Sequence, residues 1–413
     1  MSETQAIPLA VCGAGALLLA ALFVRRGLEK LSLPAVVGFL GLGMLLGGFD
    51  SQYRFAHETQ LAVLEFLGAI GLVVLLFKVG VESNLKELVK QLPKAGIIWL
   101  PNILLSGLPA YFIMRDWLGF DLAPSLFIGV AMTTTSVGVS VAVWEEMGAM
   151  KSSDGKLLLD TAELDDISGV MLMALLFSLA PMLKAAGEGD AGAGSALEWT
   201  PLLRQGGIFL LKLGLFTSAL YLLGRYLETF LEKAAGCLGD QASRVIFAFS
   251  VGIAIAGLAG IVGLSLPIGA LFAGLMLSQH PEKFAIEKFY RALYIFFVPF
   301  FFINIGFQID PSVLGGALGL GGILLAVAIL GKLAGTACTA WKFTSATGVL
   351  LLGASMVPRA EITMVIIERG RALGDWAMPP EVYAAMVLVS AGTCLGTALF
   401  LHWGLRKWRT PTG

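Results

Sequence analysis

Residues 157–177 read Leu-Leu-Leu-Asp-Thr-Ala-Glu-Leu-Asp-Asp-Ile-Ser-Gly-Val-Met-Leu-Met-Ala-Leu-Leu-Phe, and they place two neighbouring aspartates, Asp165 and Asp166, inside an apolar segment. A carboxylate at membrane depth costs at least about 2.5 kcal/mol, so it is rarely retained without a function. Two of them side by side need a cationic partner, a water-filled cavity or a bound cation. The segment therefore predicts a membrane protein that handles charge inside the bilayer.

The composition of the whole chain agrees with that prediction. Of its 413 residues, 57% are hydrophobic and 14% are charged, with a mean hydropathy of +0.84; soluble proteins carry about 25% charged residues. The four Cys are scattered without metal-ligand spacing, and the sequence has no Walker motif and no His-Glu-x-x-His. We therefore expect no cofactor, no enzymatic activity and no nucleic-acid partner, and the membrane lipid as surroundings.

Thirteen apolar stretches predict membrane-spanning helices, for which about 20 residues are needed. They cover approximately residues 7–24, 33–48, 60–80, 95–113, 122–143, 157–181, 206–223, 243–261, 263–279, 292–308, 316–341, 347–367 and 382–404. The loops between them leave no room for a soluble domain. The predicted fold class is an all-α polytopic membrane protein.

The placement of basic residues predicts the orientation. Of the 28 Lys and Arg residues, 18 lie in the loops that follow odd-numbered stretches, the C-terminal tail included, and 6 lie in the loops on the opposite side. Because basic loops stay on the cytoplasmic side, we expect the N-terminus outside and the C-terminus in the cytoplasm.

The thirteen stretches divide into two halves of six with one stretch between them. Because an odd number of stretches separates the halves, they have opposite orientations in the membrane, as an inverted repeat requires. The first repeat covers about 7–181, the linker helix about 206–223 and the second repeat about 243–404. The fifth stretch of each half is interrupted, by Thr133–Gly138 and by Ser355–Glu361. Interruptions at matching positions indicate a binding site at the midplane, although Ser and Thr can also bond to their own helix and merely bend it.

Other charged residues, Lys332 among them, also lie within the apolar stretches. Lys332 lies too far from either end of its stretch to reach water easily, and pairing with a carboxylate would satisfy both groups. Successive helical residues are about 100° apart, so Asp165 and Asp166 cannot both face one partner. One can pair with Lys332 while the other faces a water-accessible cavity and alternates between a proton and a cation. Glu163 is either an additional titrating group or a partner of Arg359.

Three other charged positions admit a plainer interpretation. Arg359 and Glu361 can neutralise each other and the ends of the half-helices, which would stabilise the interrupted segment. Lys78 lies near the end of its stretch, where its side chain can extend to the interface.

These features together resemble the bacterial Na⁺/H⁺ antiporters of the monovalent cation:proton antiporter superfamily, of the NapA/NhaA type. The similarity is carried by Thr135–Gly138, the pair Asp165-Asp166, Gly331-Lys332, Pro358–Glu361 and Phe301–Gly306. It extends over nearly the whole chain. Lys78 and Glu163 depart from the pattern, at positions that are usually apolar.

The resemblance implies an NhaA-like fold in which the two broken helices cross. The core helices would lie at about 95–181 and 316–404, and the remainder would form a dimerisation and scaffold domain. The core would move by an elevator-like displacement. The protein would be a homodimer in the bacterial cytoplasmic (inner) membrane, with a role in pH homeostasis.

The resemblance also implies roles for individual residues. Asp166 would carry the ion, and Asp165 would pair with Lys332 until Na⁺ binds at the two aspartates. Thr135 and Ser136 would offer oxygens to the ion. Exchange would be electrogenic, with two protons for one Na⁺ or Li⁺.

Two alternatives remain. A K⁺/H⁺ antiporter of the potassium-efflux type would have the same fold, although those relatives typically carry Gln at the position of Asp165. A passive cation channel is disfavoured because the fixed positive charge of Lys332 would repel cations.

Overall fold

The structure is a computed structural model of the chain. It describes residues 3–409 except 32, 55–56, 83–84, 189–203, 205–206, 209–210, 221, 223–240, 263, 265, 278–285 and 310. Of the predicted linker helix at 206–223, the described part is chiefly the helix Leu211–Leu220, and most of the remainder lies outside the described residues.

All regular elements within the described residues are helical, and nine of these helices are long and apolar enough to cross a membrane. The prediction of an all-α multi-pass protein is therefore confirmed. The helices are α1 (Glu3–Lys30), α2 (Ala35–Tyr53), α3 (Glu58–Glu82), α4 (Leu85–Phe112), α5 (Leu122–Ala131), α6 (Val137–Glu146), α7 (Ser153–Glu188), α9 (Gln241–Ile261), α10 (Leu266–Leu277), α11 (Ile286–Phe307), α12 (Leu314–Ala340), α13 (Ala346–Ser355), α14 (Glu361–Leu373) and α15 (Pro380–Arg409).

Several helices extend beyond the apolar stretches that predicted them. Helix α1 continues to Lys30, α4 begins at Leu85 and α7 continues to Glu188. The added turns contain Arg, Lys, Glu and Ala, all of which favour a helix. The charged residues among them do not favour a hydrocarbon environment. Hydropathy therefore marks the membrane-crossing part of a helix and misses its polar ends.

Both predicted interruptions are present. The fifth stretch is split into α5 and α6 by residues 132–136, and the twelfth into α13 and α14 by residues 356–360. Pro358 explains the second interruption, because proline lacks the N–H that a continuing helix needs and disfavours helical backbone at the preceding residue. The two non-helical segments contact each other, since the backbone N–H of Ser136 donates to the carbonyl of Pro358 at 2.9 Å.

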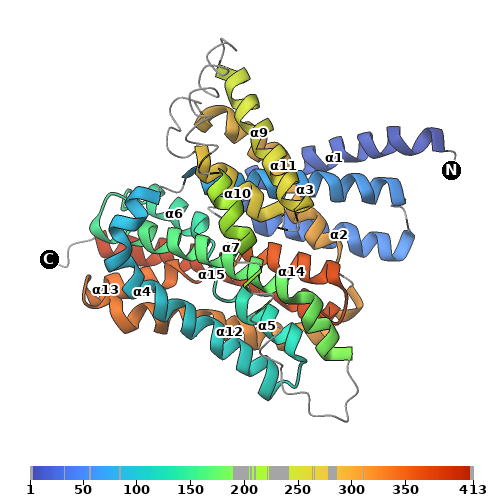
Figure 1. Cartoon of the computed structure of the whole chain (residues 1–413). Helices are drawn as coiled ribbons and strands as arrows, with labels where there is room; N and C mark the ends of the chain where they lie inside the picture. Colours follow the sequence, from blue (N-terminus) through green and yellow to red (C-terminus); the bar gives the residue numbers. More distant parts are fainter. Residues whose placement is uncertain are drawn as a thin grey trace.

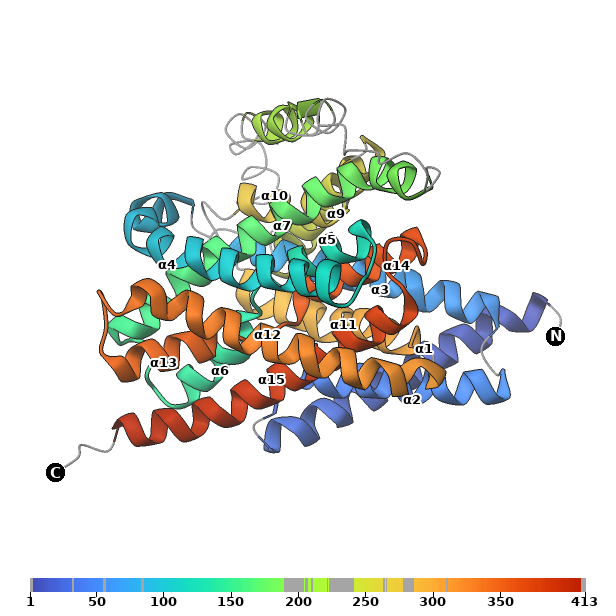
Figure 2. The same ribbon diagram turned by 90° about the horizontal axis from the view of Figure 1, so that it is seen from below.

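The helices pack as two groups, which Figures 1 and 2 show from two directions. Helices α1, α2, α3, α9, α10 and α11 pack mainly on one another, and α4 to α7 and α12 to α15 together form a second set that packs mainly on itself. Helix α1 begins and α15 ends at opposite sides of the molecule in both views. Both interrupted helices belong to the second group, which we call the broken-helix group.

Glycine allows α12 to approach α4 closely. A Cβ atom at Gly331 would lie 2.6 Å from the carbonyl oxygen of Leu105, and one at Gly335 would lie 2.5 Å from Cα of Asn102. Small residues four apart on one helix face are a common means of close packing between membrane helices. The approach brings the buried side chain of Asn102 next to Lys332.

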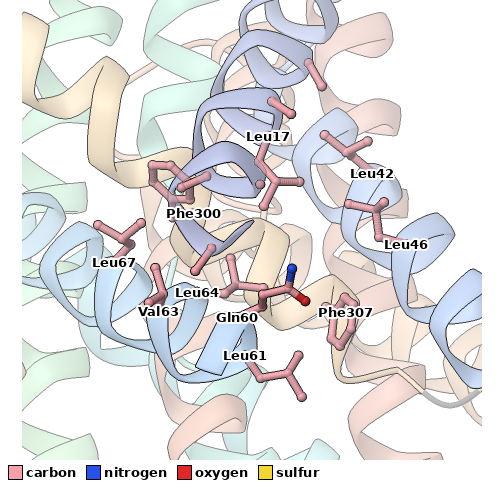
Figure 3. Close-up of a pocket in the computed structure, with 15 residues that line it drawn as sticks. Leu17, Leu42, Leu46, Gln60, Leu61, Val63, Leu64, Leu67, Phe300 and Phe307 are labelled. Carbon is pink, nitrogen blue, oxygen red and sulfur yellow. The ribbon is translucent and has the colours of Figure 1, made fainter. Parts of the chain in front are cut away.

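The other group, by contrast, encloses an apolar cavity of about 350 Å³ between α1, α2, α3 and α11. Figure 3 shows its lining, which includes Leu17, Leu46, Leu64 and Phe300, with Gln60 as a polar contributor. None of the residues that line it carries a titratable side chain. This cavity therefore has no charged group to bind an ion, whereas the buried charged residues lie in the broken-helix group.

Candidate functional site

The centre of the site is an ion pair between α12 and α7. Nζ of Lys332 lies 2.7 Å from Oδ2 of Asp165, and both side chains are fully buried. The ammonium also donates to the carbonyl of Thr133 at 2.7 Å and to Oδ1 of Asn102. Three acceptors match its three N–H donors, a condition that a buried charge must meet to be tolerated.

Asp165 has one engaged and one unengaged oxygen. Its Oδ2 accepts from Lys332 and from the hydroxyl of Thr135, whose Oγ1 lies 2.6 Å away. Its Oδ1 is buried and has no hydrogen-bond partner among the described residues. A carboxylate oxygen in that condition has the capacity to take a proton or to coordinate a cation.

The environment of Asp166 differs from that of Asp165. Asp166 is half-buried, whereas Asp165 is 1% exposed. The carboxylates of Glu361, Asp165 and Glu163 all lie within electrostatic range of Asp166. The two adjacent aspartates thus differ in environment, one fixed in an ion pair and one in a region of accumulated negative charge.

Ser136 and Glu361 connect the two interruptions. Oγ of Ser136 accepts from the backbone N–H groups of Ala360 and Glu361 at 2.8 Å each, and it contacts Oε2 of Glu361. A hydroxyl that accepts from the first backbone N–H groups of a helix acts as its cap. The Ser136 hydroxyl is therefore occupied by the start of α14, and the hydroxyl next to Asp165 is that of Thr135.

Arg359 compensates the ends of the half-helices. It is fully buried, and its Nη1 donates to the carbonyls of Thr134 and Met356, which follow α5 and α13. Carbonyl groups at helix C-termini carry a partial negative charge. The side-chain hydrogen bonds of Arg359 among the described residues thus go to carbonyls at the helix ends.

The contact of Asn102 with Lys332 was not predicted. Asn102 is completely buried on α4, and its Nδ2 donates to Oγ1 of Thr336 at 2.8 Å. The available signal was a single amide side chain inside the apolar stretch 95–113, where polar residues mark packing or function.

A cavity of about 1080 Å³ leads toward the interruptions. It lies between the two helix groups, and Gly138 and Glu361 contribute to its lining. Charged side chains from both groups line it as well: Arg25, Glu29, Lys78, Glu145, Glu146 and Arg291. Nζ of Lys78 lies over the ring of Tyr294, 5.3 Å from its centre. The cavity thus extends to Glu361, whose carboxylate lies within electrostatic range of Asp166.

Comparison with known proteins identifies the family. The family model described as "Sodium/hydrogen exchanger, transmembrane" matches residues 15–407. The chain belongs to the sodium/hydrogen exchanger family. It is thus a member of a family of membrane transporters, the cation:proton antiporters, and not an enzyme, so the resemblance seen in the sequence is confirmed.

Similar proteins agree with that membership. The High-affinity Na(+)/H(+) antiporter NhaS3 of Synechocystis is 29% identical over 85% of this chain and 74% of its own length. A Na(+)/H(+) antiporter of Enterococcus hirae is 29% identical over 92% and 94%. The Na(+)/H(+)-K(+) antiporter GerN of Bacillus cereus is 26% identical over 91% and 90%.

The fold has a solved counterpart. The structure of the sodium proton antiporter MjNhaP1 from Methanocaldococcus jannaschii at pH 8 superposes with a TM-score of 0.67 at 16% identity and covers 97% of this chain and 99% of that one. This likeness supports the antiporter fold as a whole.

Proposed function

We propose that this exchanger moves Na⁺ or Li⁺ out of the cytoplasm in exchange for external protons, and that the exchange is electrogenic. The observation that carries the proposal is the buried Lys332–Asp165 ion pair beside Asp166, at the contact of two interrupted helices. Relatives over most of the chain are named as Na⁺/H⁺ antiporters.

The coupling follows from competition for the same carboxylates. A cation that enters by way of the cavity binds Asp166 and the unengaged oxygen of Asp165, with Oγ1 of Thr135 nearby. Its charge weakens the attraction between Asp165 and Lys332, and the ammonium is displaced. Protons from the other side later neutralise the carboxylates and release the cation. Because the cation and the protons exclude each other, neither crosses without the other.

Alternating access is proposed to occur by an elevator-like displacement of the broken-helix group against the other helices. All the site residues lie in the broken-helix group, and the charged cavity lies between the two groups. We further propose a homodimer in a bacterial cytoplasmic membrane, with the N-terminus outside and the C-terminus inside. Because α1 begins and α15 ends at opposite sides of the molecule, termini on opposite faces of the membrane fit the fold, and the basic loops assign the cytoplasmic face.

The second candidate is K⁺/H⁺ exchange by the same site. It is favoured by the names of two relatives, the Na(+)/H(+)-K(+) antiporter GerN and the K(+) efflux antiporter 1, chloroplastic, of Arabidopsis thaliana. Asp165 in place of the Gln expected for potassium-efflux relatives favours Na⁺.

The test is transport by purified protein in proteoliposomes that contain a pH-sensitive dye, with Na⁺, Li⁺ and K⁺ compared. We expect Asp166→Asn to abolish cation-dependent proton movement, since the variant cannot exchange a proton for a cation. Asp160→Asn changes the same type of side chain on the same helix, outside the site, and should retain transport. Undiminished transport by Asp166→Asn would refute the carrier assignment, and a response to K⁺ alone would select the second candidate.

A further inference from the structure

We propose that Asn102 is a positioning residue that holds the Lys332 ammonium in place while Asp165 binds the transported cation. The inference rests on the proposed function, because it assigns a task to one step of that exchange. It concerns a side chain on α4, a helix that supplies none of the charged groups of the site.

The orientation of the Asn102 amide is fixed by its two partners. Lys332 has donors only, so the amide atom that faces it must be the oxygen, Oδ1. The amide nitrogen then faces Thr336 and donates to its Oγ1 at 2.8 Å. Thr336 is one helical turn beyond Lys332 on α12, so a single amide bonds both residues across the contact between the two helices.

The surroundings leave the amide little freedom. Asn102 and Lys332 are 0% exposed and Thr336 is 1% exposed. Gly331 and Gly335 bring the backbone of α4 against α12, so the Asn102 side chain lies at a close contact between the two helices. Asn102 is therefore built into the contact as a fixed hydrogen-bond acceptor.

That acceptor matters most when the ion pair is open. In the structure, Lys332 has three acceptors, of which Asp165 is one. Once Asp165 coordinates a cation, the carbonyl of Thr133 and the amide of Asn102 remain. A missing acceptor costs more when the ammonium has no carboxylate partner than when Asp165 still neutralises it. Loss of the amide thus favours the closed ion pair over the cation-bound state.

The experiment compares initial rates of cation-dependent proton movement in proteoliposomes over a range of Na⁺ concentrations. For Asn102→Leu, which keeps the side-chain size and removes the acceptor, we expect KM for Na⁺ to rise about tenfold, the equivalent of one hydrogen bond to a charged group. Vmax should stay within about twofold of the unchanged protein, because the cation-bound state, once formed, still has its carboxylates.

Two further variants separate positioning from a general loss of packing. Thr336→Val removes the acceptor that orients the amide, so KM should rise in the same direction by a smaller factor. The double variant should be no worse than Asn102→Leu, because Thr336 acts through Asn102. Ser106→Ala is the matched control: it is buried one turn further on α4, its hydroxyl bonds to the carbonyl of Asn102 on the same helix, and KM should stay unchanged.

An unchanged KM in folded Asn102→Leu, or a fall in Vmax at constant KM, would overturn the inference. Where Asn102→Leu does not fold, Thr336→Val decides alone by the same criterion. The unchanged protein tests the proposed function separately: if it moves K⁺ and not Na⁺, the proposed cation is wrong and the KM comparison is made with K⁺. If it moves no cation, the proposed exchange fails, and the inference fails with it.

Discussion

At the scale of single residues, Arg359 makes the clearest prediction about stability. It is a buried cation whose described hydrogen bonds go to backbone carbonyls at the ends of two half-helices. Without the guanidinium these buried carbonyls lose a charged donor, and leaving a buried acceptor unsatisfied costs up to about 3 kcal/mol. We expect Arg359→Gln to destabilise the protein by about that amount, measured as a fall in the midpoint of thermal unfolding in detergent.

Two comparisons make the result specific. Arg359→Lys keeps the charge but loses the fork of donors, so its midpoint should lie between those of Arg359→Gln and the unchanged protein. Arg371→Gln removes a pair with the exposed Asp375 and one hydrogen bond to the carbonyl of Met378, and it should lower stability less than Arg359→Gln does. Equal midpoints for Arg359→Gln and Arg371→Gln would contradict the role given to the helix ends.

The ion pair was predictable from the sequence, whereas the roles of Thr135 and Ser136 were not. Pairing between a buried lysine and one of two adjacent aspartates follows from desolvation and the angle between helical neighbours, and Lys332 and Asp165 do pair. The assignment of an oxygen to Thr135 or Ser136 depends on the backbone of the interruption. Neither hydropathy nor spacing specifies that backbone, and Ser136 turns out to cap α14.

At the scale of elements, the contact between α4 and α12 rests on glycine. A Cβ atom at Gly335 would lie 2.5 Å from Cα of Asn102, a backbone atom that cannot move aside by itself. We expect Gly335→Ala to force the helices apart and to destabilise the protein by about 1–3 kcal/mol, as overpacking does. The measurement is again the midpoint of thermal unfolding.

Gly319 supplies the control on the same helix. A Cβ atom there meets nothing within 4 Å, so Gly319→Ala removes only backbone freedom and should be neutral or slightly stabilising. A neutral or stabilising effect of both substitutions would show that helix propensity, and not the contact, sets the outcome. The sequence indicates that α12 is rich in Gly, but the face that meets α4 is specified only once the helices are packed.

At the scale of the whole molecule, the fold class and the interrupted helices were predictable because bilayer thickness and proline chemistry act on the sequence directly. The division into two helix groups depends on contacts between segments far apart in the chain. Hydropathy carries no information about those contacts. For that reason the sequence located the site within individual helices but could not reveal the cavity between the groups or its charged lining.

The net charge of the three residues at the buried ion pair provides the last prediction. With both aspartates ionised, Asp165, Asp166 and Lys332 sum to one negative charge, so a bound Na⁺ makes the set neutral, whereas two bound protons leave it with one positive charge. A cycle that exchanges one Na⁺ for two protons therefore moves one net charge across the membrane. On a solid-supported membrane, we expect reconstituted protein to give a transient current on a Na⁺ jump, and Asp166→Asn to give none. Intact proton exchange by the dye assay, together with electrical silence, would instead require a one-for-one exchange at the same carboxylates.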